Sequence, residues 1–393
     1  MTLFLNGPVQ NGPFTLADRP GKAAGIRLAE ALNQLTGAPP APHLWNTVTL
    51  DGDIRHRTAA AQALSRGQWE RRQLTEKYAP GPTPAAGILT DTAPQVAALA
   101  LRVCEELLAN GTLALAPVQV RLCLGCDHMT GEADHACRAC TTGAGTRPAT
   151  RRLLVHDRPE GRPVLERADF HATRASTPAH LVNIAHNAPR RLLLSRTRTH
   201  GISLGPLGLD DMVLDPRLGL HLAVLAAAAQ RGEDRLVMTI TQNAAAHVAA
   251  YGAPVRRWGG MQLRYALHGR IPYGATALRR LYEAHRVTPQ LQTLFTEWYL
   301  PLCAWRERAG ITPARLPALL KFLRRVDLAR PETPSEEVLA ELRRTAQDGD
   351  RRWVMDARVL AHALAHRAEG GSTTEPPEGE TGCTPLTPLA GTL

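Results

Sequence analysis

Four cysteines are the clearest candidates for chemistry in this chain of 393 residues. Cys123-x-x-Cys126 and Cys137-x-x-Cys140 are two CxxC pairs separated by ten residues. Four thiolates in such turns can surround Zn²⁺ as a tetrahedron with Zn–S distances of about 2.3 Å. Because a shell of four cysteines leaves no coordination position open, the spacing predicts a structural rather than a catalytic zinc. The alternative is a group of free or redox-active thiols.

A second candidate is the glycine-rich segment near the beginning. Asn6-Gly7-Pro8 follows an apolar stretch, Gly12 lies further along, and Pro20-Gly21-Lys22 opens an amphipathic segment. A strand, a glycine-rich loop and a helix N-terminus present free N–H groups and a positive dipole end to an anion. No G-x-G-x-x-G or Walker A pattern is present, which excludes the standard dinucleotide and P-loop patterns. The alternative is a turn that only joins strand to helix.

A third candidate is the basic run Ser195-Arg196-Thr197-Arg198-Thr199-His200, which follows an apolar stretch. This pattern indicates either the end of a strand that carries cations or a solvated basic loop. The net charge of +10 also favours a nucleotide or nucleic-acid partner. That signal is weakened because only three of the 46 basic residues are lysines, a skew typical of a GC-rich coding bias.

The elements that must position these residues alternate in type. Strands are expected at 2–5 and 44–50, and helices at 22–35, 57–78 and 93–109. Later strands at 152–155 and 235–241 flank a helix at 218–231, and 275–366 reads as helical. Alternation of this kind predicts the α/β class with a parallel sheet. The expected divisions are a core half at 1–117, a zinc-knuckle insertion at 118–150, the second core half at 151–275, a helical domain at 276–368 and a disordered tail at 369–393.

Composition limits the class of protein. The chain is 44% hydrophobic with a mean hydropathy of −0.20, which excludes wholesale disorder. No apolar run is long enough for a membrane span, and the start lacks a signal-like pattern, so a cytoplasmic protein without membrane contact is expected. Cys104 and Cys303 are expected in the core and Cys383 in the tail.

Taken in order, these segments resemble the catalytic core of class I aminoacyl-tRNA synthetases, specifically the methionyl-tRNA synthetase branch. That family opens with P-Y-A-N-G-P-x-H-x-G-H and carries a CxxC…CxxC knuckle in its connective insertion. It continues with I-S-R-x-x-x-W-G-I-P, W-F-D-A-x-x-G-Y and F-I-G-K-D. Across residues 1 to about 275, the matching segments are Leu3–Pro8, the four cysteines, Leu194–Ile202, Val213–Leu220 and Thr239–Asn243.

The resemblance implies a Rossmann-like core that uses ATP as a substrate, with a structural Zn²⁺ and Mg²⁺ alongside. It implies activation of an amino acid as an aminoacyl-adenylate. The implied nucleotide contacts are Asn6, Gly7, Gly12, Gly21, Gln242 and Asn243. The implied amino-acid site is Leu5, Asp51, Asp53, Val213, Asp215, Arg217 and Leu220, with Asp51 or Asp53, together with Asp215, receiving the ammonium group.

The signature motifs that hold ATP phosphates in the family are degenerate here. In the direct register the two family histidines fall on Gln10 and Pro13, which supply no charge. A second register places Arg19-Pro20-Gly21-Lys22 there, and we prefer it because phosphate stabilisation needs donors and positive charge. The K-M-S-K-S loop is absent, since no lysine lies between Lys77 and Lys321. Arg270, after an H-G pair like the one preceding that loop, is the immediate substitute, so Arg19, Lys22 and Arg270 are the expected catalytic cations.

The amino-acid pocket also departs from the family. Val213 and Leu220 replace a Trp and a Tyr, whereas Asp215 is retained. Arg217 adds a cation that methionine cannot satisfy, so a polar or acidic substrate, or an acceptor with a carboxylate, is predicted. The alternative is a salt bridge from Arg217 to Asp210 or Asp211.

Three hypotheses follow. The first is amino-acid activation with acyl transfer to a small-molecule acceptor in a biosynthetic pathway, together with a partner enzyme of that pathway. The helical domain of roughly 90 residues is too small for the family's anticodon-binding domain, so no anticodon reading of tRNA is expected. The second is a catalytically inactive pseudoenzyme that binds a protein or nucleic acid. The third is a zinc-ribbon nucleic-acid binder with an unrelated α/β domain.

Overall fold

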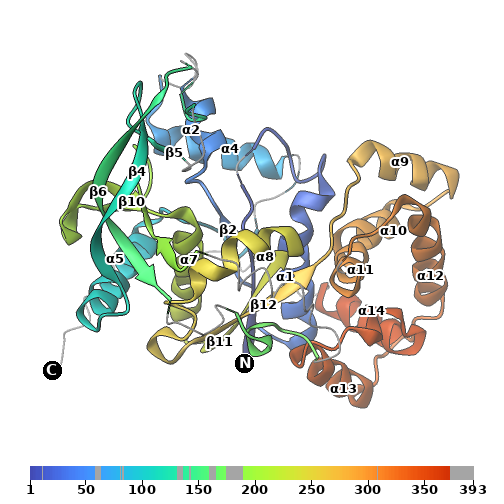
Figure 1. Cartoon of the computed structure of the whole chain (residues 1–393). Coiled ribbons are helices and arrows are strands. Elements are labelled where there is room, and N and C mark those ends of the chain that lie inside the picture. The colour runs from blue at the N-terminus through green and yellow to red at the C-terminus, as the bar shows by residue number, and fades with distance from the viewer. Residues whose placement is uncertain are drawn as a thin grey trace, which may run out of the picture.

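The computed structural model describes residues 1–10, 12–57, 63–79, 81, 84–130, 136–140, 143–158, 165–173, 189–307 and 309–371. An α/β core lies at the centre, a long twisted β-hairpin projects on one side, and a helical bundle packs on the other (Figure 1). The mixed α/β class with a parallel sheet is confirmed.

Parallel strands form the centre of the core. β1 (Thr2–Asn6) pairs with β11 (Arg235–Thr241), which pairs with β12 (Gln262–His268). β2 (His43–Trp45) pairs in parallel with β3 (Ile88–Thr90). All five residues of β1 are buried, as expected for a strand covered on both faces.

The Asn6 side chain joins these two groups of strands. Its Nδ2 donates to the Leu44 carbonyl at 2.7 Å, and its Oδ1 accepts from the Leu44 N–H at 2.9 Å. The amide thus replaces a backbone ladder between β1 and β2, and the chain beyond it continues with a parallel bridge between Gln10 and Asn46. The resulting strand order, β3-β2-β1-β11-β12, is that of a doubly wound Rossmann-like sheet.

Alternate residues of β1 face two different layers. Leu3 and Leu5 join the core that contains α5 (Pro94–Ala109) and α7 (Pro216–Ala229). Phe4 points to the opposite face, where it packs with α1 (Pro20–Thr36) and the helical bundle. The period of two along a strand therefore places one helix layer on each side of the sheet.

The bundle covers the outer side of α1 (Figure 1). Trp298, Trp305 and Trp353 are buried in it. Its helices are α9 (Ala275–Ala284), α10 (Pro289–Thr293), a π-helical turn (Leu294–Tyr299), α11 (Leu300–Arg306), α12 (Leu316–Leu328), α13 (Glu336–Gln347) and α14 (Ala357–Gly371).

The projecting hairpin contains β4 (Ala114–Cys123) and β6 (Thr146–Asp157), which pair antiparallel along ten residues of each. Two short strands extend it, β5 (Met129–Thr130) and β7 (Arg191–Leu193). Beside it, a small antiparallel sheet contains β8 (Ser195–Arg196), β9 (Ser203–Leu204) and β10 (Leu209–Leu214).

Several expected boundaries are wrong. The strand expected at 44–50 ends at Trp45, because the Thr49 hydroxyl accepts from the Gly52 N–H at 3.0 Å and begins helix α2 (Leu50–His56). Within the helix expected at 57–78, α4 (Arg66–Tyr78) is helical and begins at a capping box of Ser65 and Gln68, whereas residues 58–62 lie outside the described part. The tail expected at 369–393 begins inside α14, and residues 372–393, with Cys383, lie outside the described part.

Cys104 and Cys303 are buried, as predicted. Across the described residues, none of the helices combines the length and apolar character that crossing a lipid bilayer requires.

Replacing Asn6 by alanine tests the bridge between β1 and β2. The change leaves the buried N–H and carbonyl of Leu44 without partners, so the free energy of unfolding should fall by about 2–4 kcal/mol. Urea unfolding followed by circular dichroism measures the loss. Asn110→Ala, which removes one exposed contact to Thr112, is the matched control. Equal losses in both variants would contradict the role assigned to Asn6.

Candidate functional site

The carboxyl ends of the parallel strands gather many of the predicted residues. The strand order reverses between β1 and β11, and open α/β sheets bind ligands at such a point. Gly7 lies there and donates its N–H to the Thr239 carbonyl at 2.7 Å. A Cβ on Gly7 would lie only 2.7 Å from that same oxygen, so the two strands can approach only with glycine at this position.

The first turn of α1 lies against the segment that leaves β12. A Cβ on Gly21 would lie 2.1 Å from the Ile271 carbonyl oxygen, so the helix begins in direct contact with the residue after Arg270. Arg19 and Lys22 are exposed on this turn, and no side chain caps it. The structure thus brings the three predicted cations, Arg19, Lys22 and Arg270, to one edge of the sheet.

A small cavity of about 200 Å³ lies at the same edge. Its lining includes three predicted residues, Gln242, Asn243 and Arg270, together with His268. With its amide oxygen turned toward Arg270, Asn243 accepts from Nε at 3.3 Å. Burial lowers the pKa of His268 to about 4, so this imidazole is neutral at pH 7. Amides and one guanidinium suit an anionic group.

Lys77 is a residue that sequence reasoning missed. Its ammonium donates to the Gly12 carbonyl and lies 5.1 Å from the Phe14 ring centroid, while Lys22 lies 5.7 Å from the same centroid. Burial, reinforced by the charge of Arg55, lowers the pKa of Lys77 to about 8. Lys77 therefore holds the glycine-rich loop in place. The sequence feature that could have pointed to Lys77 is that the chain has only three lysines.

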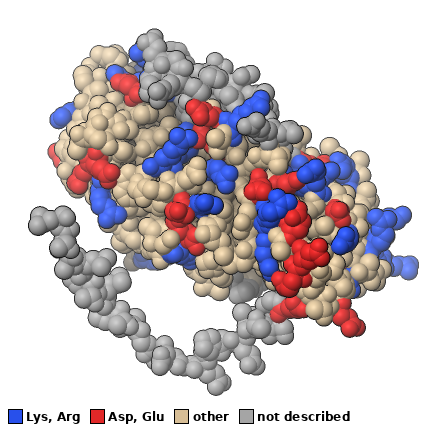
Figure 2. Space-filling view, turned by 90° about the horizontal axis from the view of Figure 1, so that it is seen from below, with Lys and Arg blue, Asp and Glu red and all other residues tan. Residues whose placement is uncertain are grey.

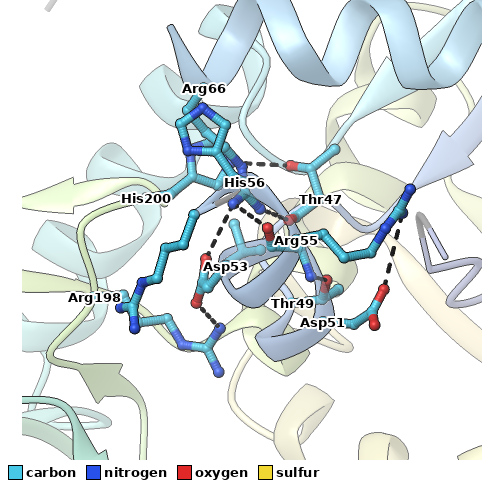
Figure 3. Close-up of polar contacts among 12 residues, drawn as sticks. Thr47, Thr49, Asp51, Asp53, Arg55, His56, Arg66, Arg198 and His200 are labelled. Carbon is cyan, nitrogen blue, oxygen red and sulfur yellow. Dashed lines mark hydrogen bonds and ion pairs between the residues drawn. The ribbon is translucent and has the colours of Figure 1, made fainter. Parts of the chain in front are cut away.

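The two predicted ammonium ligands of α2 lie in different surroundings (Figure 3). Asp51 is half exposed, 4.0 Å from Arg55. Asp53 is buried and lies between Arg198 Nη1 at 3.0 Å and Arg66 Nη1 at 3.4 Å. Only Asp53 is therefore part of a buried charged network.

Arg66 extends that network into α4. Its Nε contacts Glu70 Oε1 at 2.8 Å, and His200 Nε2 contacts the same oxygen at 3.0 Å. Arg66 also donates to the Gly52 and Thr47 carbonyls at 2.6 and 3.2 Å. Sequence reasoning missed Arg66 and Glu70, because an i, i+4 ion pair on a helix is usually a solvated one.

Asp215 is the centre of a second charged group. It caps α7, accepting from the Arg217 N–H at 3.0 Å, and its oxygens lie 2.7 Å from both Arg196 Nε and Arg217 Nη2. These contacts lower its pKa to about 2 against the opposing effect of burial. The partner of Arg217 is thus Asp215 and not Asp210 or Asp211, and its guanidinium stacks 3.5 Å from the Tyr251 ring centroid.

The remaining residues of the predicted amino-acid site, Leu5, Val213 and Leu220, are buried in the core. A Cβ on Gly201 would lie 2.9 Å from the Val213 side chain, so this glycine allows the basic segment to approach β10. The side-chain amide of Asn6 is also already hydrogen-bonded, because its Nδ2 donates to the Leu44 and Gly7 carbonyls. Direct contact of these residues with ligand stays a prediction.

Asp91 follows β3 and is fully buried beside Thr47. Its Oδ1 accepts from the Thr47 N–H at 2.8 Å and the Thr47 hydroxyl at 2.6 Å. Burial nevertheless raises its pKa to about 6, with the hydrogen bonds opposing the rise. The carboxyl ends of β2 and β3 therefore carry an acid that titrates near neutral pH.

The four predicted metal ligands are brought together, with their sulfur atoms within 4.8 Å of one another. Cys123 and Cys140 Sγ are 3.3 Å apart, and Cys126 and Cys137 Sγ are 3.7 Å apart. The Gly125 and Ala139 N–H groups donate to the first sulfur of each CxxC turn at 3.3 and 3.2 Å, as suits thiolates on a cation. The donor set and its spacing fit Zn²⁺.

The cysteine cluster is attached to both sides of the charged network. Arg57, at the end of α2, donates to the Ala139 carbonyl. On the other side, the Met129 N–H donates to the Thr197 hydroxyl at 2.6 Å, next to Arg198. A metal in this cluster would therefore hold in place the two segments that carry Asp53 and Arg198.

Comparison with known proteins gives structural matches alone. No protein-family model and no curated protein matches the chain. Two solved structures of Mycobacterium tuberculosis methionyl-tRNA synthetase do match. The one bound by methionyl-adenylate (Met-AMP) has 13% identity and a TM-score of 0.50, covering 93% of this chain and 84% of that chain. The other, in complex with methionyl-adenylate, has 11% identity and a TM-score of 0.52, covering 94% and 84%. The fold is therefore class I synthetase-like.

Metal analysis tests the cysteine cluster. Purified zinc-replete protein should contain about one zinc per chain, and Cys137→Ser should lower that ratio because a four-cysteine shell loses one ligand. Plasma mass spectrometry measures the ratio. Cys104→Ala, a buried thiol outside the cluster, should retain the metal. A ratio near zero in the unaltered protein would rule out the site.

The buried Asp91 predicts a pH-dependent stability. The folded protein retains the carboxyl proton up to about pH 6, whereas the unfolded chain loses it near pH 4. Between these values the folded state binds more protons, so stability relative to Asp91→Asn should fall with rising pH, by about 3 kcal/mol in all. Urea unfolding from pH 4 to pH 7 measures the difference.

Thr47→Val provides the matched comparison for Asp91. The change removes the 2.6 Å hydroxyl contact that favours the ionised carboxyl, so the fall in stability should move to higher pH. A pH-independent difference between the unaltered protein and Asp91→Asn would contradict the raised pKa.

Proposed function

We propose that this chain activates an amino acid with ATP as an aminoacyl-adenylate and passes the acyl group to a small-molecule acceptor. The observation that carries the proposal is the contact between the first turn of α1, which carries Arg19 and Lys22, and the segment that follows Arg270, in a class I synthetase-like fold. ATP would lie across this edge, with its phosphates near the first turn of α1 and the cavity of Gln242 and Asn243. The neighbours' bound methionyl-adenylate supports this ligand class.

In the proposed reaction, the substrate carboxylate attacks the α-phosphorus in line and pyrophosphate leaves. The protein's contribution is positioning and stabilisation of charge on the phosphates, because no covalent intermediate is needed. Arg19 and Lys22 would contact the phosphates from the helix end, and Arg270 would neutralise the leaving pyrophosphate. Mg²⁺ would arrive with the phosphates. The acyl group then passes from the adenylate to the acceptor nucleophile, releasing AMP.

The charges around Asp53 and Asp215 favour a substrate other than methionine. Four arginines, at 66, 196, 198 and 217, face three carboxylates, at 53, 70 and 215. An ammonium group alone would compete with Arg198 for Asp53. A second carboxylate on the ligand would pair with Arg198 and release Asp53 for the ammonium. We therefore infer a polar or acidic amino acid, or an acceptor that carries a carboxylate.

A second candidate function is a pseudoenzyme that binds a protein or nucleic acid. It is favoured by the absence of any lysine between Lys77 and Lys321, where the related synthetases carry their K-M-S-K-S loop. Under this alternative the same cations would bind a ligand without turnover.

Pyrophosphate exchange across the twenty amino acids, with and without candidate acceptors, distinguishes the two functions. We expect exchange with a polar or acidic amino acid. Lys22→Ala should lower it about tenfold, because one charged phosphate contact contributes about 1–2 kcal/mol. Lys321→Ala in α12, exposed and remote from the sheet edge, is the control and should exchange normally. Exchange with methionine alone would contradict the substrate class, and no exchange at all would favour the pseudoenzyme.

A further inference from the structure

A large cavity among the described residues lies away from the cation-bearing sheet edge. It measures about 570 Å³ and lies between the last three turns of α1, the segments before β2 and β3, and the bundle. Leu5 and Asn6 contribute to it, but none of the three predicted catalytic cations does. It exists because β1 is not laddered to β2 at Phe4, whose N–H and carbonyl contact the Asn33 side chain instead, at 2.9 and 2.8 Å.

Two arginines and two glutamates line this cavity. Arg27 contacts Glu30 at 3.0 Å and Glu297 at 3.4 Å, and Glu30 also contacts His43 at 2.9 Å. Glu30 therefore uses both of its oxygens, whereas Glu297 makes a single, longer contact and is nearly half exposed. Glu297 is the carboxylate that retains capacity for a further cation.

Arg367 of α14 is the guanidinium with unused capacity. One nitrogen donates to the neutral Gln34 oxygen at 2.8 Å, and the group stacks 5.9 Å from Trp298. No acidic side chain of the described chain lies within ion-pair distance of it. Burial lowers its pKa, which means that its lost hydration is not compensated. The buried Trp298 N–H, in the same lining, also has no partner among described residues.

The rest of the lining is apolar. Small side chains and prolines leave room for a hydrophobic group against a rigid wall, and these residues are Ile26, Ala29, Ala38, Pro40, Ala41, Pro42, Pro84, Ala85 and Ala86. A ligand for this cavity needs one carboxylate, one cation and an apolar body, with no net charge, because the two arginines and two glutamates already balance.

We propose that this cavity binds a free apolar α-amino acid as its zwitterion. The carboxylate pairs with Arg367, the ammonium with Glu297, and the side chain lies against the alanine and proline wall. The ligand would connect α1 with the bundle helix α14. This site is separate from the proposed adenylate-forming site and does not rest on that function.

Fluorine NMR with three matched probes tests the proposal on the full-length protein without ATP. The probes are 4-fluoro-L-phenylalanine, 3-(4-fluorophenyl)propanoate, which lacks the ammonium, and 2-(4-fluorophenyl)ethylamine, which lacks the carboxylate. The zwitterion should bind most tightly, because it alone satisfies both charges. The amine binding as tightly as the zwitterion would overturn the proposal, as would no binding of the zwitterion.

Substitutions test which side chain pairs with the carboxylate of the ligand and which pairs with its ammonium group. Arg367→Gln should weaken binding of the zwitterion at least tenfold, whereas Arg358→Gln on the exposed face of α14 should not. Glu297→Gln should weaken the zwitterion but leave the propanoate unchanged. Ala41→Trp, which fills the cavity, should abolish binding of all three probes. Thermal unfolding of each variant verifies that it folds.

Asp53→Asn separates this proposal from the adenylate site. It should leave binding of 4-fluoro-L-phenylalanine unchanged, because Asp53 does not line the cavity. Loss of binding in Asp53→Asn with normal binding in Arg367→Gln would place the ligand at the sheet edge and refute the cavity site. Pyrophosphate exchange can fail without affecting any of these outcomes.

Discussion

The side-chain amide of Asn6 holds the two halves of the sheet together. β1 ends at this residue, and its two hydrogen bonds to Leu44 substitute for a strand ladder at the junction with β2. Gly7 and α1 follow on one side of the junction, and Thr47, Asp53 and Asp91 follow on the other. These bonds are buried, so leaving the Leu44 backbone groups without a partner would be costly.

Most of the ion pairs near the carboxyl ends of the strands are made by arginine. The planar guanidinium group has five N–H donors, so one side chain can contact several acceptors at once. Arg66 spans a glutamate, an aspartate and two carbonyls, which a single ammonium could not do. No lysine lies between Lys77 and Lys321, and the cations that contact Asp53 are the guanidinium groups of Arg66 and Arg198. On the face seen from below, basic and acidic side chains are intermixed (Figure 2).

Helix α1 connects the two proposed sites. Its first turn presents Arg19 and Lys22 beside the end of β12, and its last turns present Arg27 and Gln34 to the large cavity. The bundle packs along its outer side (Figure 1). A ligand in the cavity would therefore contact the same helix whose first turn carries Arg19 and Lys22.

The amino-acid sequence by itself predicted the fold class and the cysteine cluster. These follow from local patterns: apolar runs, CxxC turns, and proline and glycine at the start of α1. Ordered short motifs also indicated the class I synthetase-like fold at identities where overall similarity is slight. The end of the strand at Trp45 was missed because the segment Asn46–Leu50 has strand-like threonine and valine residues, yet the Thr49 hydroxyl caps helix α2 there.

Only the tertiary structure decided which charges meet. Asp51 and Asp53 are two residues apart, yet one is half exposed and the other lies between arginines from distant segments. Arg217 pairs with its own helix cap rather than with Asp210 or Asp211. The large cavity could not be predicted, because it arises where the short β2 does not ladder with β1 at Phe4 and where α14, remote in the chain, contributes to the lining. Burial and partner choice depend on packing between segments remote in the chain, and no local pattern records that packing.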